Sequence, residues 1–256
     1  MDLTKSSDNA NPAPIDSIDI WFADIPEETT SIEQRTEVLL SDSEKARLSA
    51  TKSPLKRREF LLSRALMRHG LTHRFGQDEG FWIFQTKRNH APEITNLPQP
   101  VYTSLSHSKG LIGFAISETP VGLDLEIVNM KRNIDALAEV TMTQDEIYYL
   151  NQHPADKVLN FHELWCCKEA YYKSVSSLNQ ASIRFSNLSI MRMGNDTRSR
   201  HFLLNNIGDY VVAIATSVWP ISIKQKIFQT ENNNKLELLL QESTANYYRL
   251  SQKDEF

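Results

Sequence analysis

The sequence predicts an α+β protein built from two similar α/β subdomains. Two observations support this: a helix-start pattern that occurs twice, and an apolar strand that closes each half. The pattern is Ser41-x-x-Glu44 in the first half and Thr143-x-x-Glu146 in the second. A hydroxyl residue followed three positions later by Glu is the capping box with which many helices begin. The two patterns begin 102 residues apart. A repeat of this length indicates duplicated domains rather than a solenoid.

The remaining elements follow each capping box in the same order. Amphipathic segments at 57–71 and 158–175 predict one long helix in each half. Apolar runs at 111–116 and 210–215 then predict a closing strand. Alternating helices and strands with hairpin-like β stretches favour two α+β halves. Small ligands preferentially occupy clefts between domains, so we expect the site between the halves.

Length and composition indicate an ordinary globular protein. The chain has 256 residues, 40% of them hydrophobic, which is enough for two compact cores. No apolar run approaches the ~18 residues of a membrane span, and residues 1–14 lack the apolar core of a signal peptide. The net charge of −4 does not suggest a nucleic-acid partner. We expect a cytoplasmic monomer that binds neither nucleic acid nor membranes.

The domain boundaries follow from these patterns. We expect a disordered leader at 1–16, an N-terminal subdomain at 17–118, a C-terminal subdomain at 119–220 and an extension at 221–256. Residues 235–240 are a candidate short helix in that extension. The two cysteines, Cys166 and Cys167, are adjacent and cannot easily pair with each other. We interpret them as packing residues of a reduced protein.

Two acids share one face of a predicted strand at 121–128. Alternation points Leu123 and Leu125 one way, and Asp124 and Glu126 the other. Such acids would repel each other in a core unless a cation lay between them. Mg²⁺ is usually held by one or two carboxylates plus substrate phosphate. The alternative is a half-exposed strand with both acids in water, which this segment alone slightly favours.

A third acid lies on the predicted helix at 161–174. Glu169 and Lys173 are four residues apart and share a face, with Trp165 one turn earlier. An isolated pair of this kind is usually a simple helix-stabilising contact of ~0.2–0.5 kcal/mol. Beside two strand carboxylates, Glu169 can complete a set of magnesium ligands and Lys173 can neutralise a phosphate oxygen.

A polar cluster precedes the strand predicted at 110–116. Ser104, Ser106, His107 and Ser108 offer hydroxyls and an imidazole, which can cradle phosphate at the mouth of a strand. A turn with satisfied hydrogen bonds is the commoner explanation of such a motif. A Ser/His hydrolase is a further possibility, but no Gly-x-Ser-x-Gly elbow accompanies the cluster.

Positive charge is dense between residues 45 and 68. The default interpretation is a solvated helical face, above all for the run at 56–58. A second cluster, Lys87 and Arg88, lies in a predicted loop, where the two residues are either phosphate contacts or ordinary loop charges. The basic residues of the first stretch are Lys45, Arg47, Lys52, Lys56, Arg57, Arg58, Arg64 and Arg68.

Three motifs together resemble those of the surfactin-type 4′-phosphopantetheinyl transferases. They are Ser-Leu-Ser-His-Ser at 104–108, Gly-Leu-Asp-Leu-Glu at 122–126 and Trp-Cys-Cys-Lys-Glu-Ala-Tyr-Tyr-Lys at 165–173. The resemblance runs from about residue 17 to about residue 220 and includes an opening strand at 18–22. It implies two subdomains related by pseudo-twofold symmetry, with the substrate in the cleft between them.

The resemblance also implies a reaction and its residues. The family transfers 4′-phosphopantetheine from coenzyme A to a serine of an apo acyl, peptidyl or aminoadipyl carrier protein, with Mg²⁺, and releases 3′,5′-ADP. It assigns Mg²⁺ to Asp124, Glu126 and Glu169, and catalysis to Asp124, Glu169 and Lys173, with Glu169 as the base. Whether Arg58, Arg64 or Lys168 also contacts coenzyme A is left open. The implied coenzyme A contacts are Arg47, Lys87, Arg88, Ser106, His107 and Lys173.

The chain departs from the family pattern in two places. The loop that usually reads Gly-Lys-Pro is His90-Ala-Pro92, and Ser104 replaces an asparagine. Both changes lie at positions that would affect the affinity for the nucleotide, and neither affects the three acids or the lysine. Two alternatives remain: a magnesium-dependent hydrolase of nucleotide pyrophosphates, and a carrier-binding homologue without activity. Three converging acids and a lysine argue against a pure binding protein.

Overall fold

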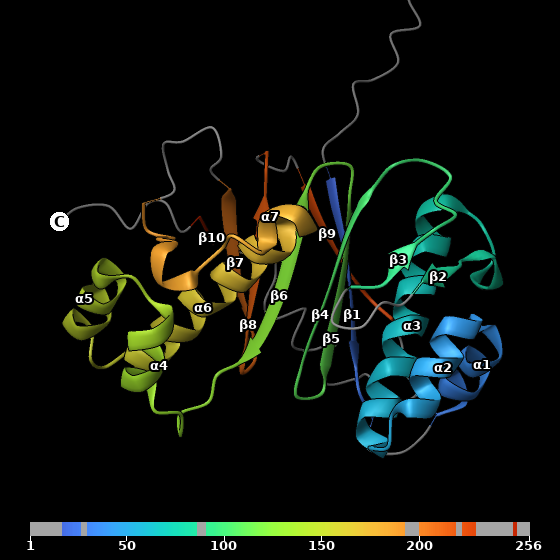
Figure 1. The fold of residues 1–256 in the computed structure, drawn as a ribbon, viewed down its shortest axis with the longest axis horizontal. Helices are drawn as coiled ribbons and strands as arrows, with labels where there is room; N and C mark the ends of the chain where they lie inside the picture. The colour runs from blue at the N-terminus through green and yellow to red at the C-terminus, as the bar shows by residue number, and fades with distance from the viewer. Residues whose placement is uncertain are drawn as a thin grey trace, which may run out of the picture.

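Two four-stranded sheets form the centre of the molecule, and each is covered on its outer side by helices (Figure 1). This computed structural model describes residues 17–26, 30–85, 91–192, 200–218, 222–228 and 248–249. The predicted mixture of helices and strands is confirmed. No helix in the described part of the chain is long and apolar enough to cross a membrane.

The first half carries three helices and the first sheet, in the strand order β4-β5-β1-β9. The capping box at Ser41 and Glu44 starts α2 as predicted, and the long amphipathic segment is α3. The elements are β1 (Ser17–Asp24), α1 (Ser31–Leu39), α2 (Asp42–Ala50), α3 (Pro54–Phe75), η1 (Glu79–Phe81), β2 (Phe84–Gln85), β3 (Glu93–Ile94), β4 (Tyr102–Ser108) and β5 (Leu111–Ser117).

The second half carries the second sheet, in the order β10-β7-β8-β6. Thr143 and Glu146 form the predicted capping box of α5, and the helix of the third acid is α6. The elements are β6 (Val121–Ile127), α4 (Ile134–Thr141), α5 (Gln144–Gln152), α6 (Lys157–Ser174), α7 (Ser177–Gln180), η2 (Phe185–Asn187), β7 (His201–Ile207), β8 (Tyr210–Thr216) and β10 (Tyr248–Arg249).

The two sheets share an apolar core. Ile20 and Phe22 of β1 pack in one cluster with Leu123 and Leu125 of β6 and Ile214 of β8. Outer clusters join each sheet to its own helices. The expectation of two separate cores is therefore incomplete, because the alternation of β1 and β6 places an apolar face of each sheet against the other.

The serines of the predicted phosphate loop instead form part of a strand. β4 lies beside β6, where the oxygens of Ser104, Ser106 and Ser108 accept hydrogen bonds from the backbone N–H groups of Leu123, Leu125 and Ile127 at 2.8, 3.1 and 3.1 Å. The cluster does precede the predicted strand, which is β5, but the expectation that it lies in a loop or turn is wrong. Every second residue of β4 supplies an acceptor to the neighbouring edge, so an extended backbone satisfies the donors of β6.

Part of the expected C-terminal extension belongs to the first sheet. β9 (Ser222–Ile227) pairs in parallel with β1, with Ser17 opposite Ser222 and Phe22 opposite Ile227. The expected leader at 1–16 and the candidate helix at 235–240 lie outside the described residues. Cys166 and Cys167 are both buried and unpaired, as expected of packing residues, and burial raises the pKa of each thiol.

Candidate active site

A cleft of about 640 Å³ opens where β4, β6 and α6 meet. The three predicted acids and Lys173 all line it, together with Ser106 and His107 of β4. The alternation of β6 explains the arrangement: Leu123 and Leu125 pack into the shared core, which leaves the carboxylates on the opposite face toward α6.

Asp124 is the most buried of the three acids, with 5% of its surface exposed. Its Oδ1 accepts hydrogen bonds from Lys173 Nζ at 2.7 Å and Ser106 Oγ at 2.9 Å. Its Oδ2 is buried and has no hydrogen-bond partner among the described residues. A buried carboxylate oxygen without a donor is costly, so it is a ready ligand position for a cation.

Glu126 is held by a tryptophan. Trp165 Nε1 donates a hydrogen bond to Glu126 Oε1 at 3.1 Å. Burial raises the pKa of Glu126, and the nearby charge of Asp124 raises it further, whereas the bond from Trp165 lowers it. The indole therefore favours the ionised carboxylate and fixes one of its two oxygens.

Glu169 has a strongly perturbed environment. Burial raises its pKa to about 7, the charges of Asp124 and Glu126 act in the same direction, and Lys173 opposes them. Glu169 makes no hydrogen bond or ion pair with another described residue. A carboxylate with a pKa near neutrality is suited to accepting a proton at physiological pH.

A glycine brings β6 close to α6. A Cβ atom at Gly122 would lie 1.9 Å from the carbonyl oxygen of Ala170, so only glycine fits at this approach. Gly122 precedes Asp124 by two residues, and Ala170 follows Glu169 directly. The contact explains why the strand acids and the helix acid share one cleft.

The donor set fits magnesium. No group of three or more His, Cys, Asp or Glu residues within the described ranges is already arranged around a metal position. However, Asp124 has a free buried oxygen, and mutual repulsion contributes to the raised pKa values of Glu126 and Glu169. A divalent cation with oxygen ligands would relieve this repulsion.

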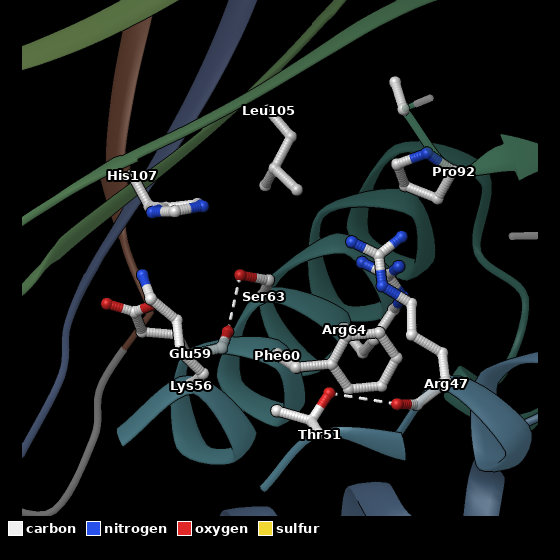
Figure 2. Close-up of a pocket in the computed structure, with 11 residues that line it drawn as sticks. Arg47, Thr51, Lys56, Glu59, Phe60, Ser63, Arg64, Pro92, Leu105 and His107 are labelled. Atoms are coloured by element: carbon white, nitrogen blue, oxygen red, sulfur yellow. Dashed lines mark hydrogen bonds and ion pairs between the residues drawn. The ribbon is translucent and has the colours of Figure 1, made fainter. Parts of the chain in front are cut away.

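A second cleft of about 450 Å³ adjoins the first and shares His107, Leu105 and Ala91 with it (Figure 2). Arg47 and Arg64 flank the ring of Phe60, with guanidinium carbons 5.8 and 4.5 Å from its centroid. Burial lowers the pKa of Arg64 to about 10, which leaves it charged at neutral pH. The cleft thus offers cationic groups beside an aromatic ring.

The structure brings most of the predicted coenzyme A contacts to these two clefts. Arg47 and His107 line the second cleft, and Lys173, Ser106 and His107 line the first. Ser106 is buried, and its hydroxyl is engaged by Asp124, Leu125 and Lys173. Lys87 and Arg88 lie outside the described residues.

The structure also places the three cations whose role was left open. Arg64 lines the second cleft, whereas Arg58 donates to the carbonyl of Pro26 and pairs with Glu33. Lys168 is fully buried, 2.6 Å from Glu146, and its ammonium also donates to three backbone carbonyls. Lys168 is therefore a structural cation of the second half.

Two residues of the second cleft were not predicted from the sequence to belong to a binding site. Lys56 and Glu59 of α3 line it and pair at 2.6 Å. The interpretation of 56–58 as a solvated face holds for Lys56, whose side chain is 58% exposed, although this residue also lines the cleft. The i,i+3 spacing of Lys56 and Glu59 can be read from the sequence, but the same spacing is typical of ion pairs on an exposed helix, so it does not indicate a cleft.

Comparison with known proteins finds a family match in the second half. Residues 120–215 match the family model described as the 4′-phosphopantetheinyl transferase superfamily. This part of the chain is therefore similar to that superfamily. The match covers β6, α6 and all of β8 but its last residue, so the matched region includes all three acids and Lys173.

Two curated relatives carry the same superfamily name. The 4′-phosphopantetheinyl transferase psf-1 of Bacillus pumilus is 33% identical over 118 residues, which are 45% of this chain and 49% of the relative. The 4′-phosphopantetheinyl transferase HetI of Nostoc sp. is 27% identical over 163 residues, 62% of this chain and 68% of the relative. The chain therefore matches about half of the length of the first relative.

Proposed function

We propose that the protein transfers the 4′-phosphopantetheine group of coenzyme A to a serine of an apo carrier protein and releases 3′,5′-ADP. The main support is the convergence of Asp124, Glu126, Glu169 and Lys173 on one cleft that adjoins a second, cationic cleft. Coenzyme A has matching parts. Its pyrophosphate would be neutralised by the Mg²⁺ that the three acids would hold, and its 3′-phosphate would be neutralised by the cations of the second cleft. The superfamily match and the names of the two relatives support the same reaction.

Asp124, Glu126 and Glu169 would hold Mg²⁺ in this proposal. When bound, the ion would supply positive charge that neutralises the pyrophosphate and orients it. Trp165 positions Glu126, and the hydrogen bond from Ser106 positions Asp124. These outer contacts hold the carboxylates ready to act as ligands.

The protein residues carry the remaining steps. The carrier serine oxygen bonds to the β-phosphorus while the bond from that phosphorus to the bridging oxygen breaks, so 3′,5′-ADP leaves. Glu169 accepts the serine proton, because its carboxylate lies in the cleft where the serine would react. Lys173 donates to an oxygen of the transferred phosphate and stabilises the charge that develops there.

We further infer that the halves at 17–118 and 119–220 are related by a pseudo-twofold axis. The strand orders β4-β5-β1 and β7-β8-β6 support this. Equivalent backbone bonds also occur, from Ile25 to Gly110 and from Val128 to Asp209. A buried capping-box Glu pairs with the long helix in both halves: Glu44 with Arg64, and Glu146 with Lys168.

Intact-mass spectrometry tests the proposed reaction. The protein is incubated with coenzyme A, Mg²⁺ and a panel of apo acyl, peptidyl and aminoadipyl carriers. A mass gain of one phosphopantetheine on a carrier, lost with EDTA and with Asp124→Ala, is the expected result. Coenzyme A cleavage without carrier modification would indicate a hydrolase, and binding without turnover on any carrier would indicate an inactive homologue.

A further inference from the structure

The second cleft contains an acid that a phosphate site does not need. Glu59 of α3 lines it beside Arg47, Lys56 and Arg64, and its side chain is only 10% exposed. A buried carboxylate beside a bound phosphate would weaken binding through repulsion. Its presence among the cations therefore calls for a specific partner.

His107 is the group that Glu59 faces across the cleft. Lys56 and Glu59 extend from α3 toward the imidazole on β4 (Figure 2). Desolvation lowers the pKa of His107, and Lys56 and Lys173 lower it further, whereas Glu59 and, more weakly, Asp124 raise it. Without a ligand the imidazole is thus neutral near pH 7, and Glu59 is the strongest charge that favours its protonation.

The ion pair between Lys56 and Glu59 is suited to exchanging partners. Nζ of Lys56 lies 2.6 Å from Oε2 of Glu59, but the lysine side chain is 58% exposed. Because its lysine is exposed, the pair can separate without burying a charge, even though Glu59 itself is buried. A phosphate that enters the cleft attracts Lys56 and favours a positive charge on His107. Glu59 then has the imidazolium as its new neighbour.

We propose that Glu59 is a positioning residue that stabilises the imidazolium of His107. This imidazolium forms when a phosphate group of the ligand enters the cleft. Phosphate binding is therefore linked to the uptake of a proton. The proton comes from solvent and is held on a ring nitrogen of His107, and no other bond changes. This inference rests on the proposed function, because it takes the ligand to be coenzyme A or its nucleotide fragment. The phosphate concerned belongs either to the 3′ position or to the pyrophosphate.

Calorimetry in two buffers with different ionisation enthalpies counts the protons. The full-length protein is titrated near pH 7.5, in EDTA, with coenzyme A, 3′-dephospho-coenzyme A and adenosine 3′,5′-bisphosphate. We expect uptake of roughly 0.5–1 proton per coenzyme A and an affinity that falls up to about tenfold per pH unit above neutrality. Uptake lost with the dephospho ligand assigns the effect to the 3′-phosphate, and uptake kept assigns it to the pyrophosphate.

Variants identify the groups responsible. Glu59→Gln should reduce proton uptake by about half or more and flatten the pH dependence, and His107→Gln should abolish both. Glu59→Asp keeps the charge and should retain most of the uptake, which provides a second reading if the glutamine variant is unstable. Glu37→Gln is the matched control, because Glu37 of α1 pairs with Arg57 of α3, the helix that carries Glu59, and lines neither cleft.

The outcomes separate this inference from the proposed function. Uptake that survives in His107→Gln would assign the proton to Glu169, and uptake unchanged in Glu59→Gln would remove the role of Glu59. Either result overturns the inference while coenzyme A still binds. Absence of coenzyme A binding to the folded wild-type protein would instead overturn the proposed function along with the inference that depends on it.

Discussion

Lys173 Nζ lies 2.7 Å from Asp124 Oδ1 and 3.0 Å from Ser106 Oγ. One ammonium group thereby connects α6 to β6 of its own half and to β4 of the other. The same charge lowers the pKa values of Glu126 and Glu169. Lys173 thus links the two halves and also sets the ionisation of the proposed metal ligands.

Replacing Lys173 by methionine should reduce carrier modification by about 10²–10³-fold, because a charge aimed at the developing phosphate charge is lost. The acid limb of the pH–rate profile should also move to higher pH, since the pKa values of Glu126 and Glu169 rise without the cation. Rates are measured by intact mass from about pH 6 to pH 9. Lys157→Met on the same helix is the control, and an unshifted acid limb would contradict the explanation.

Glu169→Gln should stabilise the protein at alkaline pH in the absence of metal. The pKa of Glu169 is raised from 4.5 to about 7 on folding, so its contribution to stability is full below about pH 4.5 and is lost as the pH rises through 7. Glutamine stays neutral and avoids this loss. We expect a melting temperature about 2–4 °C above wild type near pH 8, the shift that ~1 kcal/mol produces at this size.

The gain of Glu169→Gln should shrink toward pH 5. Thermal unfolding in EDTA across this range is the measurement, with the exposed Glu139→Gln as control. A glutamine variant less stable than wild type at every pH would show that the carboxylate is not destabilised by its surroundings.

Trp165→Phe should weaken magnesium binding by about 10–100-fold, the usual effect of removing a group that orients a metal ligand. Phenylalanine keeps an aromatic ring against Phe161 and Phe185 but cannot donate to Glu126. Metal titrations followed by calorimetry give the affinity, and carrier modification at high Mg²⁺ should recover. Unchanged metal affinity would show that the indole only packs.

Gly122→Ala should lower the unfolding free energy by ~1–3 kcal/mol or more, because its methyl group would overlap the carbonyl of Ala170. Any relief requires α6 to move away from β6, which also separates Glu169 from Asp124, so activity should fall with stability. Gly80→Ala is the control, since its Cβ would meet Leu39 at an ordinary 3.5 Å. Urea unfolding compares the two, and equal stability would contradict the close approach.

Lys168→Met should cost roughly 3–5 kcal/mol, because it leaves the buried charge of Glu146 without its ion-pair partner and with only the N–H groups of Thr143 and Ile190 as donors. The double variant with Glu146→Met should recover much of this loss, since apolar replacement of a whole buried pair is often neutral. Chemical denaturation of the two single variants and the double variant forms a mutant cycle. A double variant as unstable as the sum of the singles would mean that the two residues act independently.

Sequence patterns with a local cause predicted much of the fold. The capping boxes of α2 and α5 follow from side chains three residues apart, and the two faces of β6 follow from its alternation. The grouping of Asp124, Glu126, Glu169 and Lys173 was implied by the resemblance of three motifs to a known family. The capping boxes and the alternation of β6 depend on contacts that are close in sequence, whereas the cleft depends on the close approach of β6 to α6 at Gly122.

Contacts between distant segments explain what was not predicted. The serines of β4 favour turns by themselves, but β4 pairs with β5 as a strand and its serine oxygens accept hydrogen bonds from N–H groups of β6. Lys56 and Glu59 resemble a surface pair until β4 brings His107 against α3. The shared core between the sheets depends in the same way on how the halves meet.

The parallel pairing of β9 with β1 has a consequence for how the protein is made. β1 is the first strand of the fold, whereas the strand that covers its edge is formed by residues 222–227. An uncovered strand edge is a template for pairing with other chains. During translation this edge stays open until almost the entire second half has left the ribosome. The growing chain therefore carries an aggregation-prone surface for most of its synthesis.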